Sequence, residues 1–183
     1  KLTPATTSDF VEGIATVTVA YPNTGVITIQ AADNLDSSMK GTSGQVTFYP
    51  TSFALSAEGS QLTVNKDFTL TIKALNAQGA LTSNYNGTAN LTHKNISPEA
   101  KSGSFTPGSA KGTDFANGVA VVTNAKFDKW GTITITATDN AYASATGTSE
   151  NVSFLPKGLV LDLETPSASR SFYYINELFD VTV

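Results

Sequence analysis

Catalysis by a histidine is the first chemistry to consider, because the chain has a single histidine, His93, and no cysteine. A Ser-His-Asp triad would use that histidine as its base, but the sequence has no Gly-x-Ser-x-Gly turn to present a nucleophilic serine. His93 stands beside Lys94 in a predicted strand, a position typical of a solvated side chain. The counts also exclude zinc sites built from cysteines or from two or more histidines. The sequence therefore predicts that the chain is not an enzyme.

Two loops that lie 106 positions apart carry the oxygen ligands that calcium prefers. Asp33-Asn34-Leu35-Asp36 follows one predicted strand, and Asp139-Asn140 follows another. Asp162 and Glu164 in the next segment would complete such a site at a domain junction. However, Tyr142 stands where the first loop has an aspartate, and Asp and Asn also favour simple turns. We therefore assign no cofactor and keep calcium as a hypothesis.

Some aromatic side chains are candidates for ligand contact because a repeated fold does not require them. They are Trp130, Tyr142 and Tyr173. Trp130 aligns as an extra residue between the counterparts of Thr24 and Gly25. There it would stack on a sugar ring or a neighbouring domain, or it would cover the end of the core. Tyr173 lies in the cluster Phe172-Tyr173-Tyr174, which forms either a contact surface or the core of a partial domain.

The elements that position these residues are organised as a repeat. The stretch Gly41–Pro50 returns as Gly147–Pro156, and Ile27–Asn34 returns as Ile133–Asn140, both at a shift of 106 positions. A period of this length exceeds the ~20–50 residues of solenoid units and has the size of a whole domain. The repeat predicts an array of modules. The predicted parts are the end of one module at 1–45, a complete module at 46–150 and the start of another at 151–183.

The last part of the chain matches the first strands of the complete module. Asn176–Val183 resembles Asn65–Ile72 at a shift of 111 positions, which predicts a five-residue insertion within Leu163–Tyr174. A partial sandwich leaves open strand edges and an uncovered apolar face. We expect the two partial modules to be frayed or to pair between molecules by strand exchange. Alternatively, the first 45 residues pack on the middle module as a second sheet.

Alternating apolar and polar residues predict β-strands throughout. Phe68–Ala74 and Thr132–Ala137 each place their apolar side chains on one face. Asn95–Ala100 contains a proline and is expected to be a loop. Short strands separated by turns are typical of an Ig-like antiparallel β-sandwich. The expected strands of the complete module lie near 53–57, 66–75, 87–94, 101–106, 117–126, 130–138 and 148–155.

The composition restricts the partners. The net charge is −4 and charged residues make up 14% of the chain, so the basic surface of a nucleic-acid-binding protein is missing. No apolar run approaches the ~20 residues of a membrane span. A cysteine-free, threonine-rich, weakly charged repeat is common among bacterial cell-surface proteins.

Short motifs add a resemblance. The pattern Asn117–Ala120 followed by Gly131–Ala137 is similar to bacterial Ig-like repeats. The junctions Phe48-Tyr49-Pro50 and Phe154-Leu155-Pro156, with the block from Ser104 to Ala120, resemble MshQ-type proteins of the mannose-sensitive haemagglutinin (MSHA) pilus cluster. That resemblance implies placement in the cell envelope or at the cell surface, in a setting of pilus biogenesis or adhesion. It brings no catalytic motif.

Two functions follow as expectations. The first is a non-catalytic spacer whose partners are neighbouring Ig-like repeats or pilus components. The alternative is an adhesin module that binds carbohydrate or protein through exposed aromatic side chains such as Trp130 and Tyr142.

Overall fold

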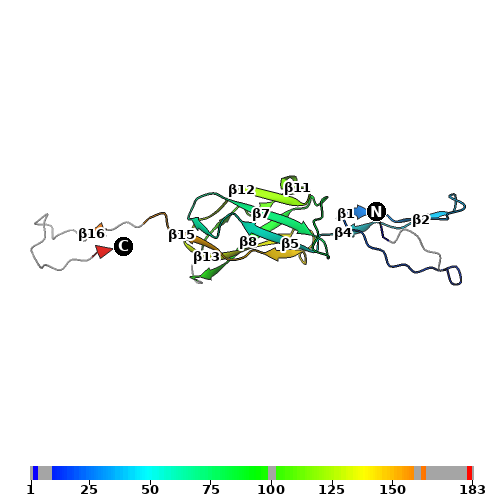
Figure 1. Cartoon of the computed structure of the whole chain (residues 1–183), viewed down its shortest axis with the longest axis horizontal. Coiled ribbons are helices and arrows are strands. Elements are labelled where there is room, and N and C mark those ends of the chain that lie inside the picture. Colours follow the sequence, from blue (N-terminus) through cyan, green and yellow to red (C-terminus); the bar gives the residue numbers. More distant parts are fainter. Residues whose placement is uncertain (1, 4–9, 99–101, 159–161, 164–180, 183) are drawn as a thin grey trace, which may run out of the picture.

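In a computed structural model, the chain forms a central body of β-strands with a smaller strand segment at each end (Figure 1). The structure describes residues 2–3, 10–98, 102–158, 162–163 and 181–182. These residues form β-strands and one short 3-10 turn, η1 (Gly112–Asp114), and they contain no α-helix. The all-β class predicted from the sequence is confirmed. Within the described ranges, no helix is long and apolar enough to cross a membrane.

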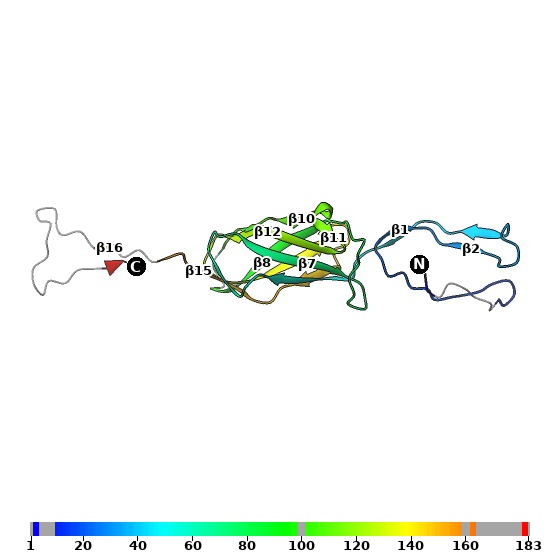
Figure 2. The same cartoon turned by 45° about the horizontal axis from the view of Figure 1, so that its top comes forward.

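The central body has two layers of strands that run along the long axis of the molecule (Figures 1 and 2). Its strands are β5 (Ser52–Ala57), β6 (Gln61–Thr63), β7 (Phe68–Leu75), β8 (Ala89–Ser97), β9 (Phe105–Thr106), β10 (Ser109–Ala110), β11 (Phe115–Ala116), β12 (Val119–Phe127), β13 (Gly131–Asp139), β14 (Thr146–Thr148) and β15 (Val152–Leu155). One layer is built on β8 and β13, extended by β10, β15 and β6. The other is built on β5, β7 and β12, with β9 and β11 paired to β12. β14 joins the layers because it pairs with both β13 and β5. This layering is that of a β-sandwich.

The core lies between the layers, and the predicted alternation forms it. Leu70 and Ile72 of β7 are fully buried, as are Ile135 of β13 and Ala120 of β12. Aromatic rings fill both ends of the core. The rings of Phe127, Phe68 and Phe154 meet at one end, and those of Phe53, Tyr85 and Phe115 meet at the other. Burying each large apolar side chain contributes about 1.5–3 kcal/mol to stability, so these rings hold the layers together.

The strands differ from expectation in their extent, their number and their direction. β8 continues through Ser97, where a loop was expected, because it follows the long strand β13 past a register shift at Thr132/Ile133. The short strands β6, β10 and β11 were not predicted, because they carry too few residues to show an alternating pattern. Two contacts, β14 with β5 and β15 with β6, are parallel, so the sandwich is not purely antiparallel.

The N-terminal segment forms two strand pairs of its own. Its strands are β1 (Gly25–Ile27), β2 (Gln30–Ala32), β3 (Lys40–Thr42) and β4 (Val46–Phe48). β1 pairs with β4 and β2 pairs with β3. Gly25 lies opposite Phe48, just as Gly131 lies opposite Phe154 in the sandwich. The β2–β3 register likewise matches the β13–β14 register at the same shift of 106 positions.

The strand pairing moves the expected boundaries. The expected start of the complete module at residue 46 would separate β4 from its partner β1. The expected end at residue 150 would remove β15, which pairs with β13 and β6. Pairing therefore places the limits of the sandwich a few residues later than the sequence suggested, near Pro50 and Pro156.

The match extends to single hydrogen bonds. The Ser43 hydroxyl accepts a bond from the Ile29 N–H at 2.8 Å, and the Ser149 hydroxyl accepts one from the Ile135 N–H at 2.9 Å. The Asp33 carboxylate accepts bonds from the N–H groups two and three residues later, and Asp139 does the same. Both segments therefore form the same local backbone structure.

At the opposite end of the molecule, β16 (Asp162–Leu163) pairs with β17 (Val181–Thr182) (Figure 1). Asp162 lies opposite Thr182, as Ser56 of β5 lies opposite Thr71 of β7. The first strand is shifted by 106 positions and the second by 111. This register agrees with the sequence alignment, which placed five extra residues between the two strands.

Candidate functional site

The sequence-derived site residues do not form one site. Trp130 precedes β13 and Tyr142 follows it. Nine extended residues span about 30 Å, so these two aromatic residues lie at opposite ends of the sandwich. Tyr173 lies outside the described residues. The two ends are therefore separate candidate sites, and the end that carries Tyr142 faces the N-terminal segment.

Asn84 joins the sandwich to the N-terminal segment. Its Oδ1 accepts hydrogen bonds from the Thr24 N–H at 3.0 Å and from the Thr24 hydroxyl at 3.3 Å. Its Nδ2 donates to the Thr24 carbonyl. Thr24 is only 7% exposed. One side chain thus binds both the backbone and the side chain of a residue 60 positions away, which fixes their relative orientation.

Aromatic stacking forms the second contact of this joint. The rings of Tyr49 and Tyr142 stack with centroids 4.9 Å apart and an interplanar angle of 16°. Such pairs contribute about 0.5–1.5 kcal/mol beyond their buried area. Pro50, which connects the two segments, is fully buried. We call the contacts of Thr24 and Tyr49 with Asn84 and Tyr142 the joint.

A buried carboxylate holds the loop that carries Tyr142. Asp139 is 3% exposed, and its Oδ1 accepts bonds from the N–H groups of Ala141 and Tyr142, each at 2.8 Å. Its Oδ2 accepts a bond of 2.6 Å from the hydroxyl of Tyr85. Burial, followed by the bond to Asp139, raises the pKa of Tyr85 far above its ordinary value. The ring of Tyr142 is therefore presented by a loop whose base is rigid.

The structure corrects the alignment of Trp130. The turns Glu12-Gly13 and Asn117-Gly118 both have positive φ at their two residues and lie 105 positions apart, whereas Gly25 and Gly131 lie 106 apart. The extra residue therefore falls between these points. β12 contains a register shift between Val122 and Ala125, and a bulge accommodates one extra residue. We place the extra residue there, so Trp130 is the counterpart of Thr24 and not an insertion.

Trp130 shares the far end of the sandwich with Leu155 and Thr63. Gly131 lies opposite Phe154, so the residues that flank this pair, Trp130 and Leu155, are neighbours across antiparallel strands. Leu155 in turn lies beside Thr63 of β6. Trp130 and Leu155 are each 48% exposed.

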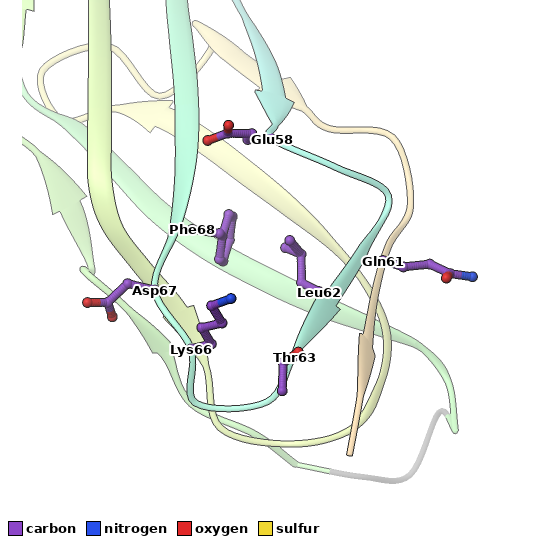
Figure 3. Close-up of a pocket in the computed structure, with 7 residues that line it drawn as sticks. All are labelled: Glu58, Gln61, Leu62, Thr63, Lys66, Asp67 and Phe68. Atoms are coloured by element: carbon purple, nitrogen blue, oxygen red, sulfur yellow. The ribbon is translucent and has the colours of Figure 1, made fainter. Parts of the chain in front are cut away.

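An open concavity of about 280 Å³ lies next to this end (Figure 3). Its lining residues are Glu58, Gln61, Leu62, Thr63, Lys66, Asp67 and Phe68. Figure 3 shows Phe68 and Leu62 facing each other, while Gln61 and Asp67 point away. Asp67 lies 3.6 Å from Lys126 on the surface. This lining contains neither a histidine nor a pair of facing carboxylates, which general acid–base catalysis would use.

His93 lies against the core, whereas the sequence suggested a solvated side chain. Its ring packs edge-on against Phe127 with centroids 5.0 Å apart, and the residue is partly buried. The alternation of β8 turns this side chain toward the interior, whereas Lys94 beside it is exposed. The geometry gives His93 a packing role.

The proposed calcium ligands are engaged in turns. Bonds from the backbone N–H groups of Asp36 and Leu35 lower the pKa of Asp33. Bonds from the hydroxyl and then the N–H of Ser38 lower the pKa of Asp36. Among the described residues, no three Asp, Glu or His side chains gather as a metal site would require. The side chains of Asp162 and Glu164 lie outside the described part of the structure.

The sequence analysis missed Thr24, Tyr49 and Asn84. Tyr49 stood in a repeated Phe-x-Pro junction, which was a usable signal. Asn84 lies in a loop without a second copy in the chain, so nothing in the sequence distinguished it. In comparisons with known proteins, no protein-family model matches the chain, and no curated protein matches it.

Proposed function

We propose that the chain is a non-catalytic spacer of Ig-like modules in a bacterial cell-surface or pilus-associated protein involved in adhesion or pilus biogenesis. The joint is the observation that carries this proposal. Tyr142, an exposed aromatic expected to contact a ligand, stacks instead on Tyr49 of the preceding segment, and Asn84 binds Thr24 beside it.

The arrangement of the strands supports the same function. The chain enters the sandwich at one end, through Pro50, and leaves it at the other, through Pro156 (Figure 1). The strands run along this axis (Figure 1). Tension between the two ends would therefore act on the hydrogen bonds between neighbouring strands in shear, with many bonds sharing the force. The matching registers of successive segments support this proposal of modules in tandem. A rigid joint between such modules would hold a terminal domain away from the cell envelope.

The chain contains no cysteine, so two introduced cysteines can carry a pair of fluorophores. Leu35 in the N-terminal segment is 96% exposed and Val121 in the sandwich is 55% exposed, which makes both suitable for labelling. We expect a single narrow distribution of energy transfer in the labelled chain. Asn84→Ala should broaden it, whereas Asn124→Ala, at an exposed asparagine outside the joint, should not. A broad distribution in the unaltered chain would refute the rigid spacer.

One observation favours the alternative of a carbohydrate-binding module. Trp130 is 48% exposed, and indole rings stack well on sugars. A broad glycan array, run with and without calcium, tests this alternative. Specific binding at micromolar concentration that Trp130→Ala abolishes, with the fold intact, would replace the spacer by a binder. Silence in both conditions supports the spacer.

A further inference from the structure

The two ends of the sandwich are related by the repeat. At the N-terminal side, Thr24 and Tyr49 flank the registered pair Gly25–Phe48. Trp130 and Leu155 flank the equivalent pair at the far end, Gly131–Phe154, each 106 positions later. Gly25 and Gly131 also share a positive φ, 117° and 129°. The backbone therefore presents these two pairs of side chains in the same way.

The first pair is already part of a joint. Thr24 contacts Asn84 and Tyr49 contacts Tyr142, and both partners lie on the end of a complete sandwich. The proline that follows each pair differs in burial: Pro50, beside the first pair, is fully buried, whereas Pro156, beside the second pair, is exposed. The far end thus carries the counterparts of Thr24 and Tyr49. These counterparts, Trp130 and Leu155, are more apolar than the first pair.

We propose that Trp130 and Leu155 form a docking surface for the end of a further module of this same fold. The occupant is the end that presents the counterparts of Asn84 and Tyr142. Leu155 would lie against the tyrosine counterpart, and Trp130 would cover the loop that holds the asparagine counterpart. This inference rests on the proposed function, because it assumes that modules follow one another through equivalent joints.

An extended chain provides the test. Residues 1–156 are followed directly by residues 51–183, so that a second complete sandwich follows the first. Trp130→Phe in the second copy leaves one tryptophan, which faces the new joint. Acrylamide quenching of its fluorescence is compared with that of the original chain. We expect quenching to fall by up to about sevenfold, because docking takes the side chain from 48% exposure toward the 7% of Thr24.

Tyr142→Ala gives a matched pair of variants. In the second copy this substitution removes the proposed partner of Leu155, so quenching should rise back toward that of the original chain. In the first copy the same substitution affects only the N-terminal joint, so quenching should stay low. Thermal unfolding followed by circular dichroism checks that each variant folds.

Unchanged quenching in the extended chain would overturn the docking surface, and so would equal effects of Tyr142→Ala in the two copies. The labelled pair at Leu35 and Val121 reports on the first joint alone. A rigid first joint with an unprotected Trp130 would therefore refute this inference and leave the spacer standing. A flexible first joint would refute the spacer itself.

Discussion

Gly147 is a position where one added methyl group should separate the two layers. It lies in β14, where an added Cβ would stand 1.8 Å from the carbonyl oxygen of Phe53 and 2.6 Å from its carbonyl carbon. Gly41 has the equivalent place in β3, and a Cβ there would meet nothing within 4 Å. The N-terminal segment has no described strand in the position of β5. Gly147→Ala and Gly41→Ala are therefore the same change with and without a neighbouring layer.

The cost follows from these distances. The obstacle at Gly147 is backbone, which cannot rotate away as the tip of a side chain would. β14 and β5 must separate by more than 1 Å to reach ordinary contact, which begins near 3.4 Å. That movement breaks the pairing of Thr146 with Ser52 and opens the packing around Phe53, which is 4% exposed. Overpacking typically costs 1–3 kcal/mol, so with this lost pairing we expect about 3 kcal/mol or more. Gly41→Ala should change stability by less than about 0.5 kcal/mol.

Urea unfolding at neutral pH, followed by circular dichroism and by the fluorescence of Trp130, measures the difference. The midpoint should fall for Gly147→Ala and stay unchanged for Gly41→Ala, with equal slopes because the surface exposed on unfolding is the same. In thermal unfolding, the expected decrease for Gly147→Ala is roughly 12 °C or more. A loss of less than about 1 kcal/mol, or equal losses in the two variants, would refute the close approach of β14 to β5.

Three further predictions concern the buried polar groups and the N-terminal segment. Tyr85→Phe should cost about 1–2 kcal/mol at neutral pH, and Asp139→Ala more, because it leaves one hydroxyl and two N–H groups without their acceptor. Because burial raises the pKa of Tyr85 in the folded state, its contribution is complete below about pH 10, the ordinary pKa of tyrosine, and is lost as the pH rises beyond it. In urea titrations between neutral and alkaline pH, the free energy of unfolding should decline by up to about 1.4 kcal/mol per pH unit. The decline should be smaller in Tyr85→Phe, and an equal decline in that variant would contradict the prediction. The Ile135 and Ile29 amides both bind a serine hydroxyl, but Ile135 is fully buried and Ile29 is not. In hydrogen exchange, the Ile135 amide should therefore be far better protected than the Ile29 amide. Equal protection would show that the N-terminal segment is as stable as the sandwich.

The sequence was informative where a local pattern decides the structure. The alternation in Phe68–Ala74 predicted the buried face of β7, and the repeat at a shift of 106 positions is matched by the shared registers. The sequence was uninformative where the structure of a segment depends on partners that are distant in the sequence. β8 extends through Ser97 because β13 is there to pair with it, and Asn84 acts because Thr24 lies opposite. The sequence alignment treated Trp130 as an extra residue because a sequence does not show where a β-bulge accommodates one.

Counterpart residues in the two segments share their register but differ in their burial. Val46 is 37% exposed and Val152 is 3% exposed, although both lie opposite an isoleucine in the same register. Val17, which lies in no strand, is 43% exposed, whereas Val122, its counterpart in β12, is 7% exposed. Register thus follows from the strand pair and its turn, whereas burial follows from the strands of the other layer.

This separation matters for the proposed array. Thr24 and Tyr49 are positioned by the pair Gly25–Phe48, and that pair forms in a segment whose apolar face is largely exposed. A short stretch of chain therefore positions the Thr24 and Tyr49 half of the joint without a complete core, whereas its other half, Asn84 and Tyr142, lies on the complete sandwich. Modules that differ in surface and core residues can keep the same joint as long as the glycine and the strand pair remain. A proposed joint built on Trp130 and Leu155 in place of Thr24 and Tyr49 would then differ in strength and keep the same backbone geometry, because Gly131–Phe154 has the register of Gly25–Phe48.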